Sequence, residues 1–262
     1  MEARYYRKLD DDKVQCELCP HYCVIELGES GKCLVRENHE GTLIATQWGH
    51  IAAMQSDPIE KKPLYHFMPG SQVFSIGGYG CNLSCSFCQN WHLSTEVGFT
   101  KQVTPERIVS YAEEDGSKAI AYTYNEPVIN LEFYLEVAKM ARERGLRNVL
   151  VSNGYVNPEP LSELLEYLDA ANIDVKSFED RFYRELCDAR LEPVLETVRG
   201  MAGRIHLELT CLVIPTQNDR DGVTGELAKW IASECGEEVP LHLSAYHPAY
   251  RAESIPPPRL LS

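Results

Sequence analysis

The amino-acid sequence predicts an α/β fold: a partial barrel of six β-strand and α-helix units that follows a small cysteine-rich unit. From residue 71 onward, short β-prone runs alternate with amphipathic helical stretches, and this alternation is typical of parallel βαβ units. Six units are fewer than the eight of a closed (β/α)8 barrel, which favours an open or partial barrel. A doubly wound sheet is the competing architecture.

The 262 residues divide into four segments by composition and punctuation. The predicted segments are a cysteine-rich metal-binding unit at 1–45, a connector at 46–70, the βα core at 71–250 and a proline-rich tail at 251–262. The first segment has little helical or strand periodicity, so we expect a metal to take the place of a hydrophobic core there. Prolines and a glycine punctuate the connector.

Six strands and five helical stretches are predicted within the core. The strands are expected at 72–77, 119–124, 148–152, 170–175, 206–213 and 240–245. The helical patterns lie at 104–115, 128–145, 158–169, 181–203, in one or two pieces, and 221–236. Thr104 suits an N-cap with Pro105 at the first helical position, and Gly145 is a signal for a helix end.

Composition and charge narrow the classes of partner. Hydrophobic residues make up 44% of the chain, enough for a sizeable core, and 25 basic against 39 acidic residues give a net charge of −14. An acidic chain is repelled by phosphate backbones and anionic membranes, so neither nucleic acid nor a membrane is an expected partner. The charged N-terminal stretch lacks an apolar signal region, and no run approaches about 20 apolar residues. We therefore expect a cytoplasmic protein.

Ten cysteines in a reducing compartment point to metal binding and not to disulfides. Cys81, Cys85 and Cys88 follow the first predicted strand in the stretch GGYGCNLSCSFCQNW, with C-x3-C-x2-C spacing. A closed zinc site or an ordinary electron-transfer cluster takes four protein ligands, so three thiolates leave one iron of a cluster open. Structural zinc, with His92 as a fourth ligand, is the alternative. The scattered Cys187, Cys211 and Cys235 are expected to pack as small apolar residues.

A second group of cysteines precedes the core. Cys16, Cys19, Cys23 and Cys33 have C-x2-C-x3-C-x9-C spacing. Four thiolates suffice for a closed site, and zinc and a second iron–sulfur cluster are both compatible with them. A closed site indicates a structural or electron-relay role.

Polar residues stand where the later strands end, at the edge where parallel α/β proteins place their sites. They are Glu126, Asn153, Asp174, Lys176 and His247. Asp174 and Lys176 alternate onto the same face of one strand, and burying both is costly unless they pair or bind a ligand. The structural alternatives are a solvated acid at Glu126, an ordinary Asn-Gly turn at Asn153 and a plain ion pair between Asp174 and Lys176.

Taken together, the motifs resemble a known family over most of the chain. They are CELCPHYC, GKCLVREN, DPIEKKPLYHFMPGS, GCNLSCSFCQNW, YTYNEP, SNGY, IDVKSF, LVIPTQND and LSAYHP, between residues 16 and 248. In these stretches the chain resembles the radical SAM superfamily, and within it the radical SAM enzymes of the AmmeMemoRadiSam group, which are related to pyruvate formate-lyase activating enzyme. No role beyond packing against the barrel mouth is assigned to DPIEKKPLYHF.

The resemblance implies specific cofactors and ligand sets. A [4Fe–4S] cluster on Cys81, Cys85 and Cys88 would cleave S-adenosylmethionine (SAM) to a 5′-deoxyadenosyl radical that abstracts hydrogen from a substrate. The resemblance places Phe87, Glu126, Asn153, Asp174, Lys176 and His247 around SAM, with Asp174 and Lys176 also helping to hold a monovalent cation and His247 near the ribose. Two features depart from the family pattern, since Tyr124 and Asn125 replace two glycines and His92 replaces an acidic residue.

The implied partners are a one-electron donor such as flavodoxin or ferredoxin and, as one option, a protein substrate activated as a glycyl radical. Two other function classes stay open: a non-catalytic iron–sulfur or zinc protein for electron transfer or scaffolding, and radical modification of a metabolite or RNA. Some relatives also carry a C-terminal Cys-Pro-x-Cys element. This sequence ends before it, so it is either naturally short or truncated.

Overall fold

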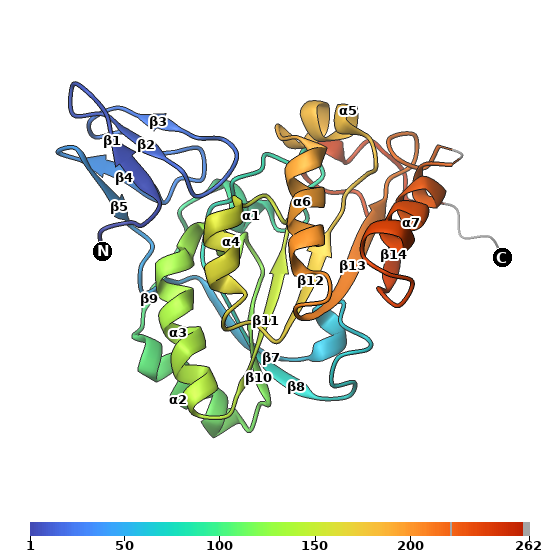
Figure 1. The fold of residues 1–262 in the computed structure, drawn as a ribbon, viewed down its shortest axis with the longest axis horizontal. Helices are drawn as coiled ribbons and strands as arrows, with labels where there is room; N and C mark the ends of the chain where they lie inside the picture. The colour runs from blue at the N-terminus through green and yellow to red at the C-terminus, as the bar shows by residue number, and fades with distance from the viewer. Residues whose placement is uncertain (221, 259–262) are drawn as a thin grey trace.

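A seven-stranded sheet forms the centre of the computed structural model, which describes residues 1–220 and 222–258 (Figure 1). Its order is β14-β13-β12-β11-β10-β8-β7. The strands are β7 (Ala53–Pro58), β8 (Gln72–Gly77), β10 (Ala119–Tyr122), β11 (Arg147–Ser152), β12 (Ala170–Asp174), β13 (His206–Val213) and β14 (Leu241–Ala245). Six of them are parallel, and β7 runs antiparallel to β8. These six are the predicted strands, with ends that differ by two residues at most.

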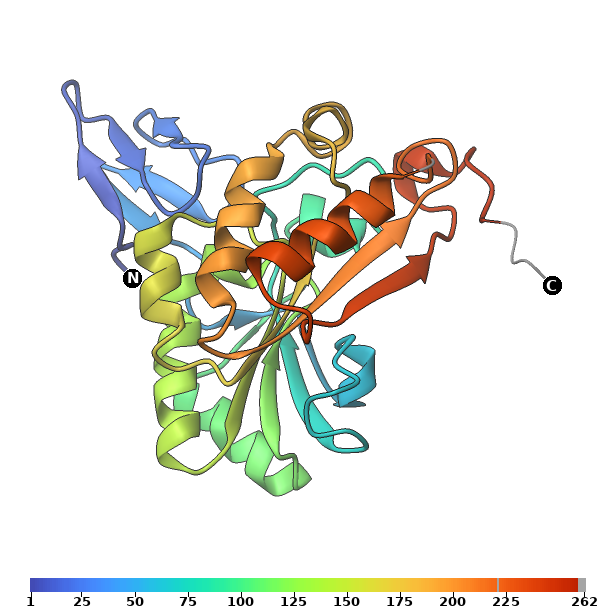
Figure 2. The same cartoon turned by 45° about the vertical axis from the view of Figure 1, so that its right-hand side comes forward.

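The strand order decides between the two predicted architectures. From β8 to β14 the parallel strands follow one another in sequence order without a reversal. Right-handed connections between such strands place every crossover helix on the same face, and Figures 1 and 2 show the helices gathered there. A doubly wound sheet needs a reversal of strand order. The partial barrel is therefore confirmed.

Helices form within all five predicted helical stretches, and the structure adds two short ones at 91–95 and 250–252 that were not predicted. The helices of the core are α1 (Trp91–Thr95), α2 (Pro105–Asp115), η2 (Pro127–Asn130), α3 (Leu131–Glu143), α4 (Pro158–Leu164), α5 (Asp180–Phe182), η3 (Tyr183–Cys187), α6 (Leu191–Met201), α7 (Val223–Glu234) and η4 (Tyr250–Ala252). The Thr104 side chain caps α2 by accepting from the backbone N–H of Arg107, as predicted. The 181–203 pattern forms two pieces. Residue 221 and part of the proline-rich tail, residues 259–262, lie outside the described residues. None of the helices described combines the length and the apolar character that crossing a bilayer requires.

The stretch predicted as a connector contributes to the main sheet. It holds β6 (His50–Ile51), β7 and the 3-10 helix η1 (Ile59–Lys61), and β6 pairs with the short strand β9 (Lys101–Gln102). β7 pairs with β8 over its whole length. Its sequence, AMQSDP, is polar and ends in proline, which a strand tolerates at the edge of a sheet. Such a strand lacks the apolar pattern by which the other six were found.

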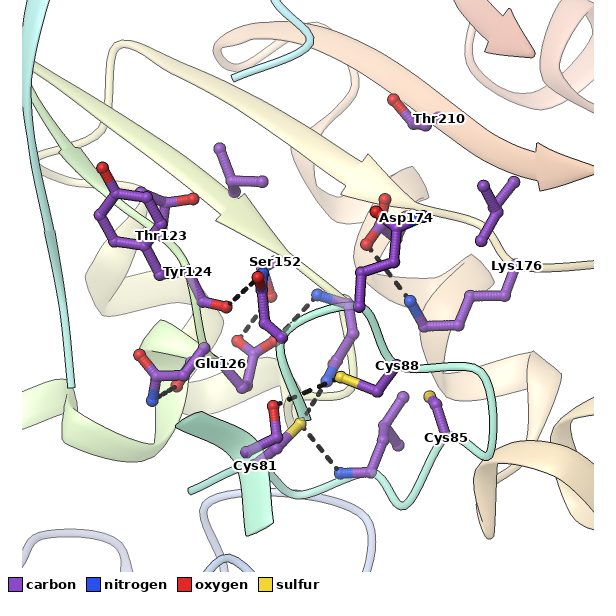
Figure 3. A pocket seen from close by; sticks show the side chains of 18 of the residues that line it. Cys81, Cys85, Cys88, Thr123, Tyr124, Glu126, Ser152, Asp174, Lys176 and Thr210 are labelled. Atoms are coloured by element: carbon purple, nitrogen blue, oxygen red, sulfur yellow. Dashed lines mark hydrogen bonds and ion pairs between the residues drawn. The ribbon is translucent and has the colours of Figure 1, made fainter. Parts of the chain in front are cut away.

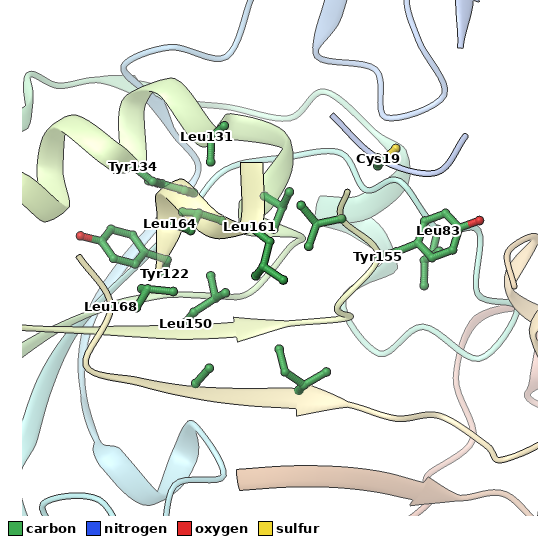
Figure 4. Packing of buried hydrophobic residues seen from close by; sticks show 14 of the residues in the cluster. Cys19, Leu83, Tyr122, Leu131, Tyr134, Leu150, Tyr155, Leu161, Leu164 and Leu168 are labelled. Carbon is green, nitrogen blue, oxygen red and sulfur yellow. The ribbon is translucent and has the colours of Figure 1, made fainter. Parts of the chain in front are cut away.

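The N-terminal unit has regular structure and buries apolar side chains. It contains β1 (Tyr6–Lys8), β2 (Val14–Cys16), β3 (Val24–Ile25), β4 (Arg36–His39) and β5 (Thr42–Ala45), each too short to produce a detectable period. Val14, Leu18 and Leu43 are buried and belong to the same apolar cluster as the barrel core. Figure 4 shows Cys19 close to Leu83 and Tyr155 of the barrel. A core shared with the barrel therefore supports this unit, so a metal is not its sole support, and the predicted metal site itself stays a prediction.

A buried ion pair fastens the N-terminal unit to the barrel. The Arg36 guanidinium donates to both carboxylate oxygens of Glu132 on α3 at 2.8 Å and to the backbone carbonyl of Arg4 at 2.9 Å. The side chains of Arg36 and Glu132 are only 1% and 4% exposed. The backbone N–H of Arg4 also donates to Glu132. An ion pair in which one guanidinium nitrogen contacts both carboxylate oxygens, with further hydrogen bonds, compensates part of the cost of desolvating two charges.

Removing one partner of this pair is expected to be strongly destabilising. Glu132→Ala should lower the free energy of unfolding by about 3–5 kcal/mol, because the Arg36 charge would stay buried without its partner. Guanidinium unfolding of the anaerobically purified protein measures the change. The control is Glu114→Ala, which breaks the exposed Arg107–Glu114 pair and should cost less than about 1 kcal/mol. Equal losses in the two variants would contradict the proposed anchoring role.

Candidate functional site

A cavity of about 300 Å³ opens at the carboxyl ends of the parallel strands (Figure 3). Its walls come from the loop after β8 and from the ends of β10, β11, β12, β13 and β14. Among the predicted site residues, those lining it are Cys81, Cys85, Phe87, Cys88, Glu126, Asn153, Asp174 and Lys176. The fold thus brings residues from four separate βα units to one place.

The three cysteines on the loop after β8 have surroundings that suit metal-bound thiolates. The Cys81 sulfur accepts from the backbone N–H of Leu83 at 3.4 Å and from Nδ2 of Asn153 at 3.7 Å. Such N–H···S hydrogen bonds stabilise sulfur ligands of iron–sulfur clusters. Three thiolates are one fewer than the four ligands of a closed zinc site, whereas in a cluster each thiolate binds a different iron. The donor set therefore fits a cluster better than single-ion zinc.

Gly80 lets this loop lie directly against the N-terminal unit. Its φ is +80°, and a Cβ built there would lie 2.3 Å from the backbone oxygen of Cys33. An L-residue would be strained by the backbone conformation and would clash with that oxygen. Glycine is required here because two cysteine-bearing segments meet.

Glu126 connects the ends of β10 and β11. One carboxylate oxygen accepts from the Ser152 hydroxyl at 2.7 Å and from the backbone N–H of Val128 at 3.1 Å, and the other accepts from the backbone N–H of Asn153 at 2.9 Å. Burial raises the pKa of Glu126, and these hydrogen bonds act in the opposite direction. A carboxylate has about four acceptor positions, so one remains for a cationic ligand in the cavity.

Asn153 links the cavity wall to the cysteine loop. Its Nδ2 donates to the side-chain oxygen of Asn82 at 2.9 Å as well as to the Cys81 sulfur, and its Oδ1 accepts from the backbone N–H of Tyr155 at 2.8 Å. Gly154 follows with φ +71°. The Asn-Gly turn thus positions a side chain that contacts a candidate cluster ligand.

Asp174 and Lys176 form an ion pair on the wall contributed by β12. The Lys176 ammonium lies 3.2 Å from Asp174, whose side chain is 42% exposed, while that of Lys176 is 13% exposed. Burial alone would lower the pKa of Lys176, but Asp174 and the neighbouring Cys85 outweigh it and raise the pKa well above its usual value. The lysine is therefore a fixed positive charge beside the cysteines.

The other two predicted residues lie in different surroundings. Phe87 is buried and packs on Phe182, with ring centroids 5.5 Å apart. His247 is exposed beyond the end of β14 and does not line the cavity. Its role near SAM stays a prediction from the resemblance.

Sequence reasoning missed residues that shape the cavity without charge. Asn125 accepts from the backbone N–H of Gly78 at 2.9 Å and donates to the carbonyls of Tyr79 and Gly80 at 3.0 Å, so it holds the loop that leads into Cys81. Ser152 and Ser244 also line the wall. The sequence did show that Asn125 stands where the family has a glycine. This departure indicates a local difference, but it does not reveal that Asn125 binds the backbone of the loop before Cys81.

The distinctive 57–67 segment has a structural role on the cavity wall. Asp57 accepts from Lys62 at 2.7 Å, from the Tyr124 hydroxyl at 2.7 Å and from Lys61 at 3.2 Å. Lys62 also lies 4.6 Å from the ring centroid of Tyr124, which lines the cavity. Burial opposes ionisation of Asp57, yet the three hydrogen bonds outweigh it and hold its pKa at about 2. This network fixes the Tyr124 side of the cavity.

The same segment is also fixed to β13 and β14. Glu208 is fully buried and accepts from the backbone N–H groups of Tyr65 and His66, at 3.0 and 2.9 Å. It also accepts from the His206 and His242 rings at 2.9 and 2.6 Å. Every acceptor position of this carboxylate is therefore occupied, which explains its burial.

Comparison with known proteins decides the family. Residues 75–228, more than half of the chain, match the radical SAM superfamily. The chain belongs to this superfamily. It is 44% identical over 262 residues to an uncharacterized protein of Methanocaldococcus jannaschii, a match that covers 98% of this chain and 77% of that protein. Pyruvate formate-lyase 1-activating enzyme of Escherichia coli K12 is 21% identical over 199 residues, covering 69% of this chain and 80% of the enzyme.

Solved structures of other proteins share the fold. Streptococcus suis SuiB bound to S-adenosylmethionine superposes with a TM-score of 0.55 at 12% identity, covering 70% of this chain and 44% of SuiB. Methylornithine synthase superposes with a TM-score of 0.54 at 16% identity, covering 72% of this chain and 58% of the synthase. Membership of the radical SAM superfamily, with relatives among the activating enzymes, implies SAM-cleaving radical chemistry on a [4Fe–4S] cluster.

Asp57→Asn tests the network that fixes the cavity wall. The folded pKa of Asp57 is about 2, against about 3.9 for an unperturbed aspartate. At pH values above this unfolded pKa, the ionised carboxylate therefore contributes about 2–3 kcal/mol to the free energy of unfolding. That contribution is lost only as pH falls through the folded pKa. The variant should therefore lose about 2–3 kcal/mol of unfolding free energy at every pH from 6 to 8, measured by urea unfolding under anaerobic conditions.

The exposed Asp10 provides the matched control. Asp10→Asn should change the unfolding free energy by less than about 0.5 kcal/mol. An Asp57→Asn loss as small as that of the control would show that the network does not stabilise the fold. A loss that varies between pH 6 and 8 would show that another titrating group governs it.

Proposed function

We propose that this protein is a radical SAM enzyme whose [4Fe–4S] cluster is held by Cys81, Cys85 and Cys88. The observation that carries the proposal is that these three thiols share one cavity with charged side chains from two later strand ends. Three protein thiolates leave one iron free for a ligand. When bound, cluster and SAM supply one-electron cleavage of the S–C5′ bond, which gives methionine and a 5′-deoxyadenosyl radical that abstracts hydrogen from a substrate.

The charged residues of the cavity match the groups of an amino acid. Glu126 retains an acceptor position for the ammonium group of SAM, because only three donors of the protein occupy its oxygens. Lys176 offers a positive charge to the carboxylate of SAM, and Asp174 orients the lysine from 3.2 Å. Fixing both ends of the ligand beside the cysteines is the contribution that the protein makes to the reaction.

Asn153 and Phe87 act on the cysteines and their loop. The Asn153 side chain donates to the Cys81 sulfur, and hydrogen bonds to the sulfurs tune the potential of a cluster. Phe87 is 4% exposed and packs on α5, so it closes the loop between Cys85 and Cys88 against solvent. Both residues keep the environment of the thiolates dry and fixed.

We infer that the substrate is a protein, activated by formation of a glycyl radical. Relatives among the activating enzymes support this choice, and so does the open sheet, whose described strands do not close into a barrel and leave β14 at an edge. Each turnover needs one electron, for which a flavodoxin or ferredoxin is the fitting donor. The free thiols suit the reducing cytoplasm.

Formation of 5′-deoxyadenosine tests the cleavage reaction. The anaerobically reconstituted protein, reduced with dithionite in the presence of SAM, should form 5′-deoxyadenosine, measured by liquid chromatography and mass spectrometry. Cys85→Ala should abolish the product because a cluster ligand is lost, while Cys235→Ala, outside both cysteine groups, should retain it. No product from fully loaded protein would refute the proposal and leave an electron-transfer or scaffold protein.

Lys176→Met tests how SAM is held. Loss of a charged hydrogen bond of about 1.5–3 kcal/mol corresponds to a roughly 10- to 150-fold weaker Kd for SAM. Equilibrium dialysis with labelled SAM measures the Kd, and circular dichroism checks the fold. Lys229→Met removes an exposed lysine on α7 and should leave the Kd within about twofold. An unchanged Kd in Lys176→Met would exclude the lysine from the SAM site.

A further inference from the structure

The N-terminal cysteines converge on a small cavity beneath their own strands. Its lining includes Cys16, Cys19, Cys23 and Cys33, with His21, Arg36 and Asn82 among the other residues. Cys16 is the last residue of β2, and its backbone N–H donates to the carbonyl of Cys23 at 2.9 Å. Three of the thiols are buried and Cys23 is half-buried. Four cysteines spread over eighteen residues therefore form one site.

Backbone amides point at three of these sulfurs. Each amide belongs to the residue two positions after the cysteine: Leu18 for Cys16, His21 for Cys19 and Val35 for Cys33. The same relation holds between Cys81 and Leu83 in the proposed active-site loop. Amides placed this way stabilise thiolates that bind metal.

The position of the thiols distinguishes between the two metals that the sequence left open. Zinc has no redox chemistry and would serve structure alone. A [4Fe–4S] cluster on four thiolates carries electrons, and this site lies against the loop that holds the first cluster, because Cys33 packs on Gly80. We propose that Cys16, Cys19, Cys23 and Cys33 bind a second [4Fe–4S] cluster, which passes electrons to the first.

The chain segments that carry the two cysteine groups pack directly against each other. The backbone of Cys33 packs against Gly80, the residue before Cys81, so closely that no side chain fits between them. His21 donates from Nε2 to the backbone carbonyl of Asn82 at 2.7 Å, and Asn82 follows Cys81 in the chain. These contacts place the two proposed cluster sites on neighbouring segments.

The ligand count and the local charge fit an electron carrier. Four protein thiolates leave no open iron, so this cluster does not bind SAM and serves electron transfer. Arg36 lines the same cavity and is buried beside the thiols. A buried guanidinium also compensates the negative charge of a cluster with four thiolates.

The relay rests on the proposed SAM cleavage and moves one electron at a time. A reduced flavodoxin or ferredoxin loses one electron, and the N-terminal cluster is reduced and then reoxidised. The cluster on Cys81, Cys85 and Cys88 gains that electron, which is consumed when the S–C5′ bond of SAM breaks. No proton or group is transferred between the two clusters.

Metal content tests the site without any use of activity. The variant with Cys81, Cys85 and Cys88 all replaced by alanine, purified anaerobically, should retain about four iron atoms and about four sulfide ions per chain, against about eight of each in the native protein. Mössbauer spectra of the variant should show a [4Fe–4S] cluster. One zinc per chain without iron, or no metal, would refute the proposal. Should the variant fail to fold, a native content near four iron atoms would refute it equally.

Dependence on the electron donor tests the relay. In the double variant Cys19→Ser and Cys33→Ser, 5′-deoxyadenosine formation driven by reduced flavodoxin should be lost relative to formation driven by dithionite. Cys235→Ser is the control and should keep the native ratio. A ratio that stays native in the double variant, or loss with both reductants, would overturn the relay. If the native protein forms no 5′-deoxyadenosine with either reductant, the proposed SAM cleavage fails, while the metal content still decides the second cluster.

Discussion

A single chain of buried hydrogen bonds connects the barrel, the cysteine loop and the N-terminal unit. Glu126 accepts from the backbone N–H of Asn153, the Asn153 side chain donates to Asn82, and the Asn82 carbonyl accepts from His21. Each of these groups is polar and buried or half-buried, so each needs its partner. The position of the Cys81 loop therefore depends on a carboxylate at the end of another strand. In this way the ends of β10 and β11 and the N-terminal unit fix the geometry of one site.

Much of the fold could be predicted because its strands carry the alternation that parallel βα units require. The strand His206–Val213 was predicted with the bounds that the structure has, and Thr104 caps its helix as expected. β7 was missed because an edge strand that exposes polar residues has no apolar pattern. The strands of the N-terminal unit, two to four residues long, are defined by pairing across the chain and not by local sequence.

The site could be predicted where a residue type carries its own chemistry, and not where its role depends on a distant partner. Glu126, Asp174 and Lys176 were found because charged residues at strand ends are costly to bury without a ligand. Asn125 binds the backbone of Gly80, 45 residues away, and Asp57 binds Tyr124, 67 residues away, as well as the nearby Lys62. Neither periodicity nor motif spacing could reveal these contacts. His247 was carried over from the family, and its exposed position shows how little a motif says about side-chain placement.

The order of the strands has a consequence for the order of folding. Each parallel strand pairs with the next one along the chain, so the sheet can grow through contacts that are local in sequence. The N-terminal unit differs, because its hydrogen bonds join residues that are far apart in the chain. Arg4 donates to Glu132 and Glu163, 128 and 159 residues later, and Lys32 donates to Asp188, 156 residues later. Closing such long loops has an entropic cost that only the completed barrel offsets. The N-terminal unit therefore completes these contacts only after the distant barrel segments that carry their partners are in place. Under the proposal of a second cluster, its four thiols stay accessible for assembly until then.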